Sequence, residues 1–123
     1  MKRFIFIFLV LCLARAVSAE SELKIITELE MQKMTDELLT TEGHYVDDKG
    51  YAYQVYTTPT NTAWVTKPTY VLHPAIYIRD ITVSEKKLEV KGIGYATKDS
   101  DTFRKWLKGF DAQNRALEAL ASE

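Results

Sequence analysis

Apolar residues recur at intervals of three and four near the start of the chain, in a stretch without proline or glycine. This spacing predicts a helix over residues 22–41, with Ser21 as its N-cap and Gly43 at its end. The apolar stripe of this helix consists of Leu23, Ile26, Leu29, Met34 and Leu38. Ile25, Met31 and Leu39 lie outside the stripe, so part of a second helix face is expected to be covered as well.

The same spacing returns near the end of the chain, at Phe103, Trp106, Leu107 and Phe110. It predicts a second amphipathic helix over residues 101–110, capped by one of the polar residues at 99–101. Gly109 is expected to end or kink this helix. After it, Leu117 and Leu120 give a short helical tail a weak apolar stripe.

Between the two helices, apolar and polar residues alternate in a way that is typical of strands. The predicted strands cover residues 51–58, 62–66, 76–83 and 88–95. Residues 47–50 predict a turn before the first of them. The expected fold class is therefore α+β. It has a small, mainly antiparallel sheet of three or four strands, packed by the helices at 22–41 and 101–110.

The third predicted strand changes the side of its apolar residues halfway along. Ile76 and Ile78 lie on one face of an ideal strand, whereas Ile81 and Val83 lie on the other. A β-bulge at residues 79–80 would restore one buried face. The alternative is a strand buried on both faces, which needs no bulge but leaves an arginine and an aspartate hard to place.

Gly92 and Gly94 follow an alternating apolar run and raise the question of a phosphate-binding loop. A dinucleotide-binding loop needs a third glycine that opens a helix, and a P-loop needs a glycine directly before the lysine. Neither pattern is present. Both glycines share one strand face, so we expect them to leave a shallow trough in which Trp106 or Phe103 of the following helix packs.

The first residues of the chain have the pattern of a secretory signal peptide. Lys2 and Arg3 precede an apolar stretch at residues 4–14. Arg15 ends that stretch well short of the ~20 residues that cross a bilayer, so a retained membrane anchor is disfavoured. The small residues that end at Ala19 suit signal peptidase, and we expect cleavage after this position.

This leader sets the expected organisation and compartment. A signal peptide at residues 1–19 precedes a single domain at residues 20–123, in a periplasmic or secreted protein. Cys12 is the only cysteine and lies in the leader. The mature domain is therefore cysteine-free and is expected to be held by its core without a disulfide.

Charge and side-chain spacing disfavour several classes of function. With 16 Lys and Arg residues against 17 Asp and Glu residues, the chain offers no basic surface for nucleic acid. His44 and His73 do not have a metal-ligand spacing, and residues 99–104 lack the pattern of a calcium loop. No metal, cofactor or catalytic residue is expected, and we expect that the protein is not an enzyme. The remaining enzyme hypothesis places His44 beside Asp47 or Asp48.

Aromatic residues are concentrated in the middle of the chain. All but one of the seven tyrosines, together with Trp64, lie between Tyr45 and Tyr77. Tyrosine suits half-buried sheet surfaces, and ordinary packing accounts for many of these residues. The candidate binding residues are Tyr56, Trp64 and Tyr70. An aromatic patch combines a large apolar area with polar tips that dock a protein strand or a sugar ring.

A hairpin and a helix follow each other over residues 76–110. Their succession consists of Ile78, Ile81, Val83, Leu88, Val90, Gly92 and Gly94, a polar cap, and then Phe103, Trp106 and Leu107. This order resembles the periplasmic domain of PilN-like fimbrial assembly proteins and related secretion-platform proteins. The resemblance implies a module that binds other proteins in an envelope machine. That family resembles a membrane-anchored ferredoxin-like fold with a closing strand, whereas this chain ends in a helix, and no functional residue is carried over.

Together these patterns favour a secreted or periplasmic protein-interaction module whose partner is a protein of the cell envelope. It would be an accessory subunit of a secretion, pilus or conjugation machine, or an inhibitor of a periplasmic enzyme. The alternative is a domain that binds a small ligand or glycan with a face rich in tyrosine and tryptophan. We expect no nucleic-acid partner and no stable membrane insertion after leader cleavage.

Overall fold

The computed structural model describes residues 20–41, 45–59, 61–85 and 87–121, which form an α+β structure. The strands are β1 (Glu22–Ile25), β2 (Tyr45–Lys49), β3 (Tyr53–Thr57), β4 (Asn61–Thr66), β5 (Ala75–Ser84) and β6 (Lys87–Ala96). The helices are α2 (Glu28–Thr40) and α3 (Asp101–Ala121). The predicted leader at residues 1–19, the predicted helix end at Gly43 and the candidate His44 lie outside the described residues.

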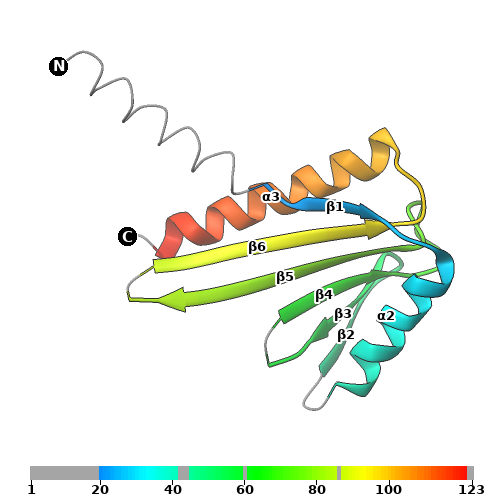
Figure 1. Cartoon of the computed structure of the whole chain (residues 1–123), viewed down its shortest axis with the longest axis horizontal. Coiled ribbons are helices and arrows are strands. Elements are labelled where there is room, and N and C mark those ends of the chain that lie inside the picture. Colours follow the sequence, from blue (N-terminus) through cyan, green and yellow to red (C-terminus); the bar gives the residue numbers. More distant parts are fainter. Residues whose placement is uncertain (1–19, 42–44, 60, 86, 122–123) are drawn as a thin grey trace.

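The strands form one six-stranded mixed sheet in the order β1-β6-β5-β4-β3-β2 (Figure 1). Strands β2 to β6 form antiparallel pairs, each with the next strand in the sequence. β1 pairs with β6 and runs parallel to it. The sheet is therefore larger than the three or four strands predicted. The four predicted strands correspond to β3–β6. The additional strands are β1 and β2, and β2 includes residues for which the sequence predicts a turn.

The start of the predicted N-terminal helix is a strand. β1 runs beside the end of β6, and α2 begins only after Thr27. Thr27 Oγ1 accepts a hydrogen bond from Glu30 N–H, and the Glu30 carboxylate accepts from Thr27 N–H. This capping box fixes the helix start. The predicted cap, Ser21, instead donates its N–H to Asp111 of α3. Pairing with β6, which the local pattern does not reveal, overrides the helical spacing of these residues.

The two helices cover opposite faces of the sheet. On the α3 face, the core consists of Ala75, Tyr77, Ala96, Phe103, Leu107 and Phe110. On the α2 face, the core consists of Met31, Leu38, Tyr56, Ala63 and Ile76. Successive strand residues point to opposite faces, so Ile76 and Tyr77 belong to different cores. The sheet is thus the middle layer of three, and both of its faces contribute apolar residues.

β5 changes the face of its apolar residues without a distortion. Its register with β6 is continuous over all ten residues, so the β-bulge predicted at residues 79–80 is absent. Ile76 and Ile78 pack on the α2 face, whereas Ile81 and Val83 lie on the α3 face. Of the two charged residues between these pairs, the arginine is buried under α3 and the aspartate is exposed.

α3 is a single helix that extends eleven residues beyond the predicted range of 101–110. Gly109 does not end it, and a Cβ atom at this glycine would meet nothing within 4 Å. Ser100 Oγ accepts a hydrogen bond from Phe103 N–H at the helix start, as one of the predicted caps. No helix in the described part of the chain is long and apolar enough to cross a membrane.

Gly92 and Gly94 lie on the α3 face and allow the helix to approach the sheet closely. A Cβ atom at Gly94 would overlap the Leu107 side chain, and one at Gly92 would overlap the Tyr77 hydroxyl. The predicted trough is therefore confirmed. The residue above Gly94 is Leu107, however, and not one of the two aromatic residues that the sequence predicts.

Candidate functional site

The three predicted binding residues do not form one patch. Trp64 stands opposite Val55 in the pairing of β3 with β4, so Trp64 lies on the α3 face while Tyr56 lies on the α2 face. Tyr70 belongs to the loop between β4 and β5. The alternation of strand side chains separates Tyr56 from Trp64 by the thickness of the sheet.

Trp64 packs beside a buried cation in the α3 core. The guanidinium carbon of Arg79 lies 4.6 Å from the centre of the indole ring, and the ring of Phe110 lies 5.1 Å from it. Burial lowers the pKa of Arg79 from its ordinary value. The negative face of an aromatic ring attracts a cation at this distance. Trp64 therefore stabilises the interior charge.

Tyr70 is held in a chain of side chains at the rim of the same core. Trp106 Nε1 donates to the Tyr53 hydroxyl over 2.7 Å, and Tyr53 donates to the Tyr70 hydroxyl over 3.2 Å. The rings of Tyr53 and Tyr70 meet edge to face at 5.1 Å. These contacts hold the β4–β5 loop against α3.

A network of hydrogen bonds ties α3 to the sheet beneath it. Arg79 Nε donates to Asn114 Oδ1 over 2.6 Å, and Asn114 Nδ2 donates to the Tyr77 hydroxyl over 2.8 Å. The Tyr77 hydroxyl bonds to Ser21 Oγ over 2.7 Å, and Ser21 N–H donates to Asp111 over 2.8 Å. Every buried side-chain N and O atom of the described residues has a partner. The network is satisfied internally, which gives it a structural role.

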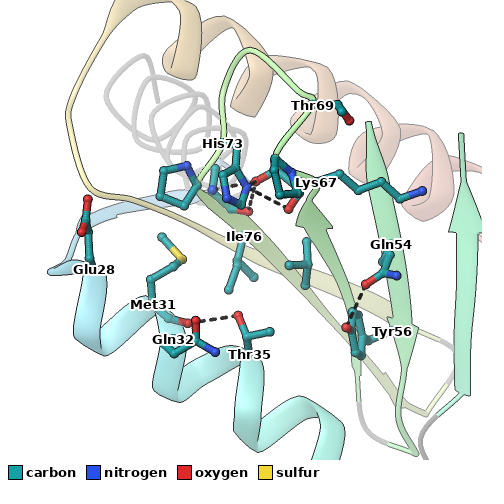
Figure 2. A pocket seen from close by; sticks show the side chains of 15 residues that line it. Glu28, Met31, Gln32, Thr35, Gln54, Tyr56, Lys67, Thr69, His73 and Ile76 are labelled. Carbon is teal, nitrogen blue, oxygen red and sulfur yellow. Dashed lines mark hydrogen bonds between the residues drawn. The ribbon is translucent and has the colours of Figure 1, made fainter. Parts of the chain in front are cut away.

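A groove of about 760 Å³ opens on the α2 face, between α2 and the loop that joins β4 to β5 (Figure 2). Apolar side chains form part of its wall: Met31, Tyr56, Val65 and Ile76. Polar residues also line it: Glu28, Gln32, Thr35, Gln54, Thr66, Lys67, Thr69 and His73. The volume lies within the range of about 300–1,000 Å³ that is typical of ligand pockets.

Several polar groups of the groove bond to one another. The Tyr56 hydroxyl donates to Gln54 Oε1 over 3.1 Å, and burial raises the pKa of Tyr56. Thr66 Oγ1 bonds to His73 Nδ1 over 3.0 Å. Figure 2 shows the Glu28 carboxylate at one end of the groove, above the apolar side chain of Met31. This arrangement suits a ligand with an apolar body and few polar groups.

The acidic residues considered for an enzyme form ion pairs at the surface. Asp47 pairs with Lys49 over 2.8 Å, and Asp48 pairs with Lys67. Within the ranges that the structure describes, no three His, Cys, Asp or Glu side chains gather closely enough to hold a metal ion.

β5 and β6 extend beyond the rest of the sheet (Figure 1). β4 pairs with β5 only as far as Asp80, and β1 pairs with β6 only from Ile93 onward. We call residues 81–84 of β5 and 87–90 of β6, which lie beyond these limits, the hairpin end.

The hairpin end exposes apolar side chains on the α3 face. Ile81 is 46% exposed and Val83 is 72% exposed. Leu120, in the last turn of α3, is 67% exposed. Gln113 lies seven residues before Leu120, on the same side of the helix, and its side chain accepts a hydrogen bond from Arg79 of β5. Leu120 is therefore on the side of α3 that faces β5.

The two edges of the hairpin end differ. On the outer edge of β6, the Val90 N–H donates to Glu118 Oε2 of α3 over 3.3 Å. On the edge of β5, β4 has ended, and no described strand pairs with residues 81–84 on that side. One edge is thus covered by the helix, and the other has no described strand beside it beyond Asp80.

The sequence indicated the hairpin end only indirectly. Ile81 and Val83 are the residues whose apolar phase differs from that of Ile76 and Ile78. At this change of phase, the apolar side chains of β5 change from the α2 face to the α3 face. Their exposure depends on where β4 ends, and a local pattern does not set that length.

Comparison with protein-family models, curated proteins and solved structures gives no match. The functional proposals therefore rest on the groove and the hairpin end.

Proposed function

We propose that this protein is a secreted or periplasmic protein-interaction module, and that its hairpin end binds a protein of the cell envelope. Such a module is an accessory subunit of a secretion, pilus or conjugation machine, or an inhibitor of a periplasmic enzyme. The supporting observation is the exposure of Ile81, Val83 and Leu120 at one end of the molecule. Exposed apolar residues that gather in one place mark interaction surfaces, whereas single ones are ordinary.

The chain offers a closely matched control for this surface. Leu29 is 67% exposed, as Leu120 is, but it lies on α2. Replacement by glutamine removes a similar apolar area at both positions without adding charge. A difference in partner capture between the two variants therefore reflects the position of the leucine and not the loss of apolar area itself.

The test is quantitative capture of the partner from envelope extract of the source organism by the tagged protein. We expect Leu120→Gln and Val83→Asp to lower capture of the same partner by about tenfold or more, as substitutions at the centre of an interface do. Leu29→Gln is expected to change it by less than about twofold. Circular dichroism verifies that each variant is folded. Equal capture by all variants would contradict the proposal.

A second candidate function is the binding of a small ligand or glycan, and the groove on the α2 face favours it. The apolar wall and the volume of about 760 Å³ suit a small apolar molecule. The predicted face rich in tyrosine and tryptophan is not the basis of this candidate, because Tyr56 is only 3% exposed and Trp64 lies on the other face.

NMR titration of the Met31 methyl group with octanoate and with chitobiose tests this second function. Octanoate is expected to shift the signal more than the disaccharide does, because the side chain of Met31 is part of the apolar wall. Thr35→Trp fills the groove and is expected to abolish the shift. Lys33→Trp, at an exposed position of α2 that does not line the groove, is expected to preserve it. A shift that survives Thr35→Trp would place the ligand elsewhere.

A further inference from the structure

The groove on the α2 face contains many polar groups, but several of them already bond within the chain. Thr66 Oγ1 accepts from Ala75 N–H over 2.9 Å and donates to the Ala75 carbonyl over 3.1 Å. Thr35 Oγ1 donates to the Met31 carbonyl over 3.1 Å. These hydroxyl groups hold the walls of the groove in place and leave little hydrogen-bonding capacity for a ligand.

Lys67 lines the groove, but its charge is paired outside it. The ammonium group forms an ion pair with Asp48 and also donates to the Gly50 carbonyl, and neither of these two residues lines the groove. Figure 2 shows the Lys67 side chain directed away from Glu28. An anionic ligand would have to compete with Asp48 for this ammonium group. Lys67 therefore does not make the groove attractive for an anion.

Glu28 is the acidic residue that lines the groove. Within the part of the chain that the structure describes, no hydrogen bond or ion pair joins its carboxylate. Lys98 lines a neighbouring hollow together with Glu28, but the two side chains form no ion pair. The start of α2 carries about half a positive charge, which a second carboxylate in the same turn, that of Glu30, offsets. The Glu28 end of the groove is therefore suited to a cation.

The far side of the groove has the opposite preference. The Gln54 Oε1 atom accepts from the Tyr56 hydroxyl, so its amide N–H groups are the part of this side chain that can meet a ligand. N–H donors disfavour an ammonium group. Figure 2 shows the apolar side chains of Met31 and Ile76 between Glu28 and Gln54. A ligand with one cationic end would thus place that end at Glu28 and its apolar chain over the two apolar residues.

We infer that the groove binds an aliphatic molecule that carries a primary ammonium group at one end. This inference rests on the second candidate function and names its ligand class. The ammonium group donates to the Glu28 carboxylate, and the aliphatic chain packs against Met31 and Ile76. A molecule of the same length with a carboxylate in place of the ammonium group is repelled by Glu28.

The test compares octylammonium with octanoate, which share an aliphatic chain and differ in the sign of their charge. The Met31 methyl signal of the folded protein from residue 20 onward is titrated below the micelle concentration of each compound. We expect octylammonium to bind about fivefold or more tightly than octanoate, because one partly exposed ion pair replaces one repulsion. In about 1 M sodium chloride, screening is expected to lower this ratio below about twofold. Equal affinities at low salt, or tighter binding of octanoate, overturn the inference.

Glu28→Gln and Glu37→Gln form a matched pair of variants. Each removes one negative charge from an exposed position of α2 and keeps the size of the side chain, but Glu37 does not line the groove. We expect the ratio of the two affinities to fall below about twofold in Glu28→Gln and to stay within about twofold of its original value in Glu37→Gln. Circular dichroism verifies the fold of both variants. A preference that survives Glu28→Gln, or that Glu37→Gln removes equally, overturns the inference.

A lysine side chain of another protein carries the same ammonium group on a shorter chain. Acetyl-lysine-amide is therefore a further probe, and it is expected to bind at least about tenfold more weakly than octylammonium because it has fewer methylene groups to bury. Equal or tighter binding of this probe would assign the groove to a protein side chain and overturn the inference.

The outcome also separates this inference from the function on which it rests. If octylammonium and octanoate shift the Met31 signal with equal affinity, the groove binds small apolar ligands and only the preference for a cation fails. If neither compound shifts the signal, the second candidate function fails together with the inference.

Discussion

The two halves of the β5–β6 hairpin have the same strand register but different surroundings. In the half from residue 75 to 80, which we call the covered half, helices lie on both faces, β4 borders β5, and β1 borders β6 from Ile93 onward. In the hairpin end, α3 lies on one face, one edge is bonded to Glu118, and no described strand pairs with the other edge beyond Asp80. The same hairpin thus provides the centre of the core and, a few residues away, the exposed surface.

This difference shows that packing and recognition are divided along single strands. Ile76 is 1% exposed and Val83 is 72% exposed, although both are β-branched residues of one strand. The first stabilises the fold because burial removes its apolar area from water. The second contributes little in the free protein, so its apolar area remains available for a partner.

The largest expected effect is the difference in stability between variants of these two residues. Ile76→Ala is expected to lower the free energy of unfolding by about 2–5 kcal/mol, because it leaves a cavity in the α2 core. Val83→Ala is expected to change it by less than about 0.5 kcal/mol. Urea denaturation followed by circular dichroism measures both. Similar losses at the two positions would show that the hairpin end is part of the core.

The buried network of the covered half gives the next effect. Asn114→Ala removes the acceptor of Arg79 Nε and the donor to the Tyr77 hydroxyl. A loss of about 2–3 kcal/mol is expected, because the Nε of a buried cation loses its acceptor and the Tyr77 hydroxyl loses a donor. Chemical denaturation provides the value. A loss below about 1 kcal/mol would indicate that solvent replaces the asparagine readily.

The close approach of α3 to the covered half gives a third effect. Gly94→Ala is expected to destabilise the protein by about 1–3 kcal/mol, because the new methyl group overlaps Leu107. Gly109→Ala is the control on the open side of α3 and is expected to stabilise by about 0.5–1 kcal/mol. Thermal melting of the two variants should shift in opposite directions. Melting shifts of the same sign would show that the helix does not approach the sheet as closely as described.

The smallest effect concerns the covered edge of the hairpin end. Glu118→Ala removes the acceptor of Val90 N–H and is expected to cost about 1 kcal/mol or less. Exchange of the Val90 amide proton is expected to become faster, whereas exchange at Thr82 stays slow. Unchanged exchange at Val90 would mean that another group covers this edge.

The sequence predicted the elements whose pattern is local and strong. The strands β3–β6, the first half of α3 and the role of Gly92 and Gly94 follow from alternation, helical spacing and the absence of side chains. It did not predict β1 or β2. β1 depends on a parallel partner about 70 residues away, and β2 contains Asp47 and Asp48, which are typical of turns.

The candidate site was less predictable than the fold. Tyr56, Trp64 and Tyr70 were selected for their residue type, but the faces of β3 and β4 separate the first two. Ile81 and Val83 attracted attention only as a break in phase. A β-bulge and a change of helix cover produce the same apolar pattern, and only the register distinguishes them.

The sequence by itself determined the α+β class, the positions of the central strands, and the glycines that admit α3, because these depend on side-chain periodicity and size. The tertiary structure alone decided which face each strand residue meets, where the neighbouring strands end, and which apolar side chains stay exposed. Those properties arise from contacts between segments distant in sequence, and an interaction surface is the area that such contacts leave uncovered.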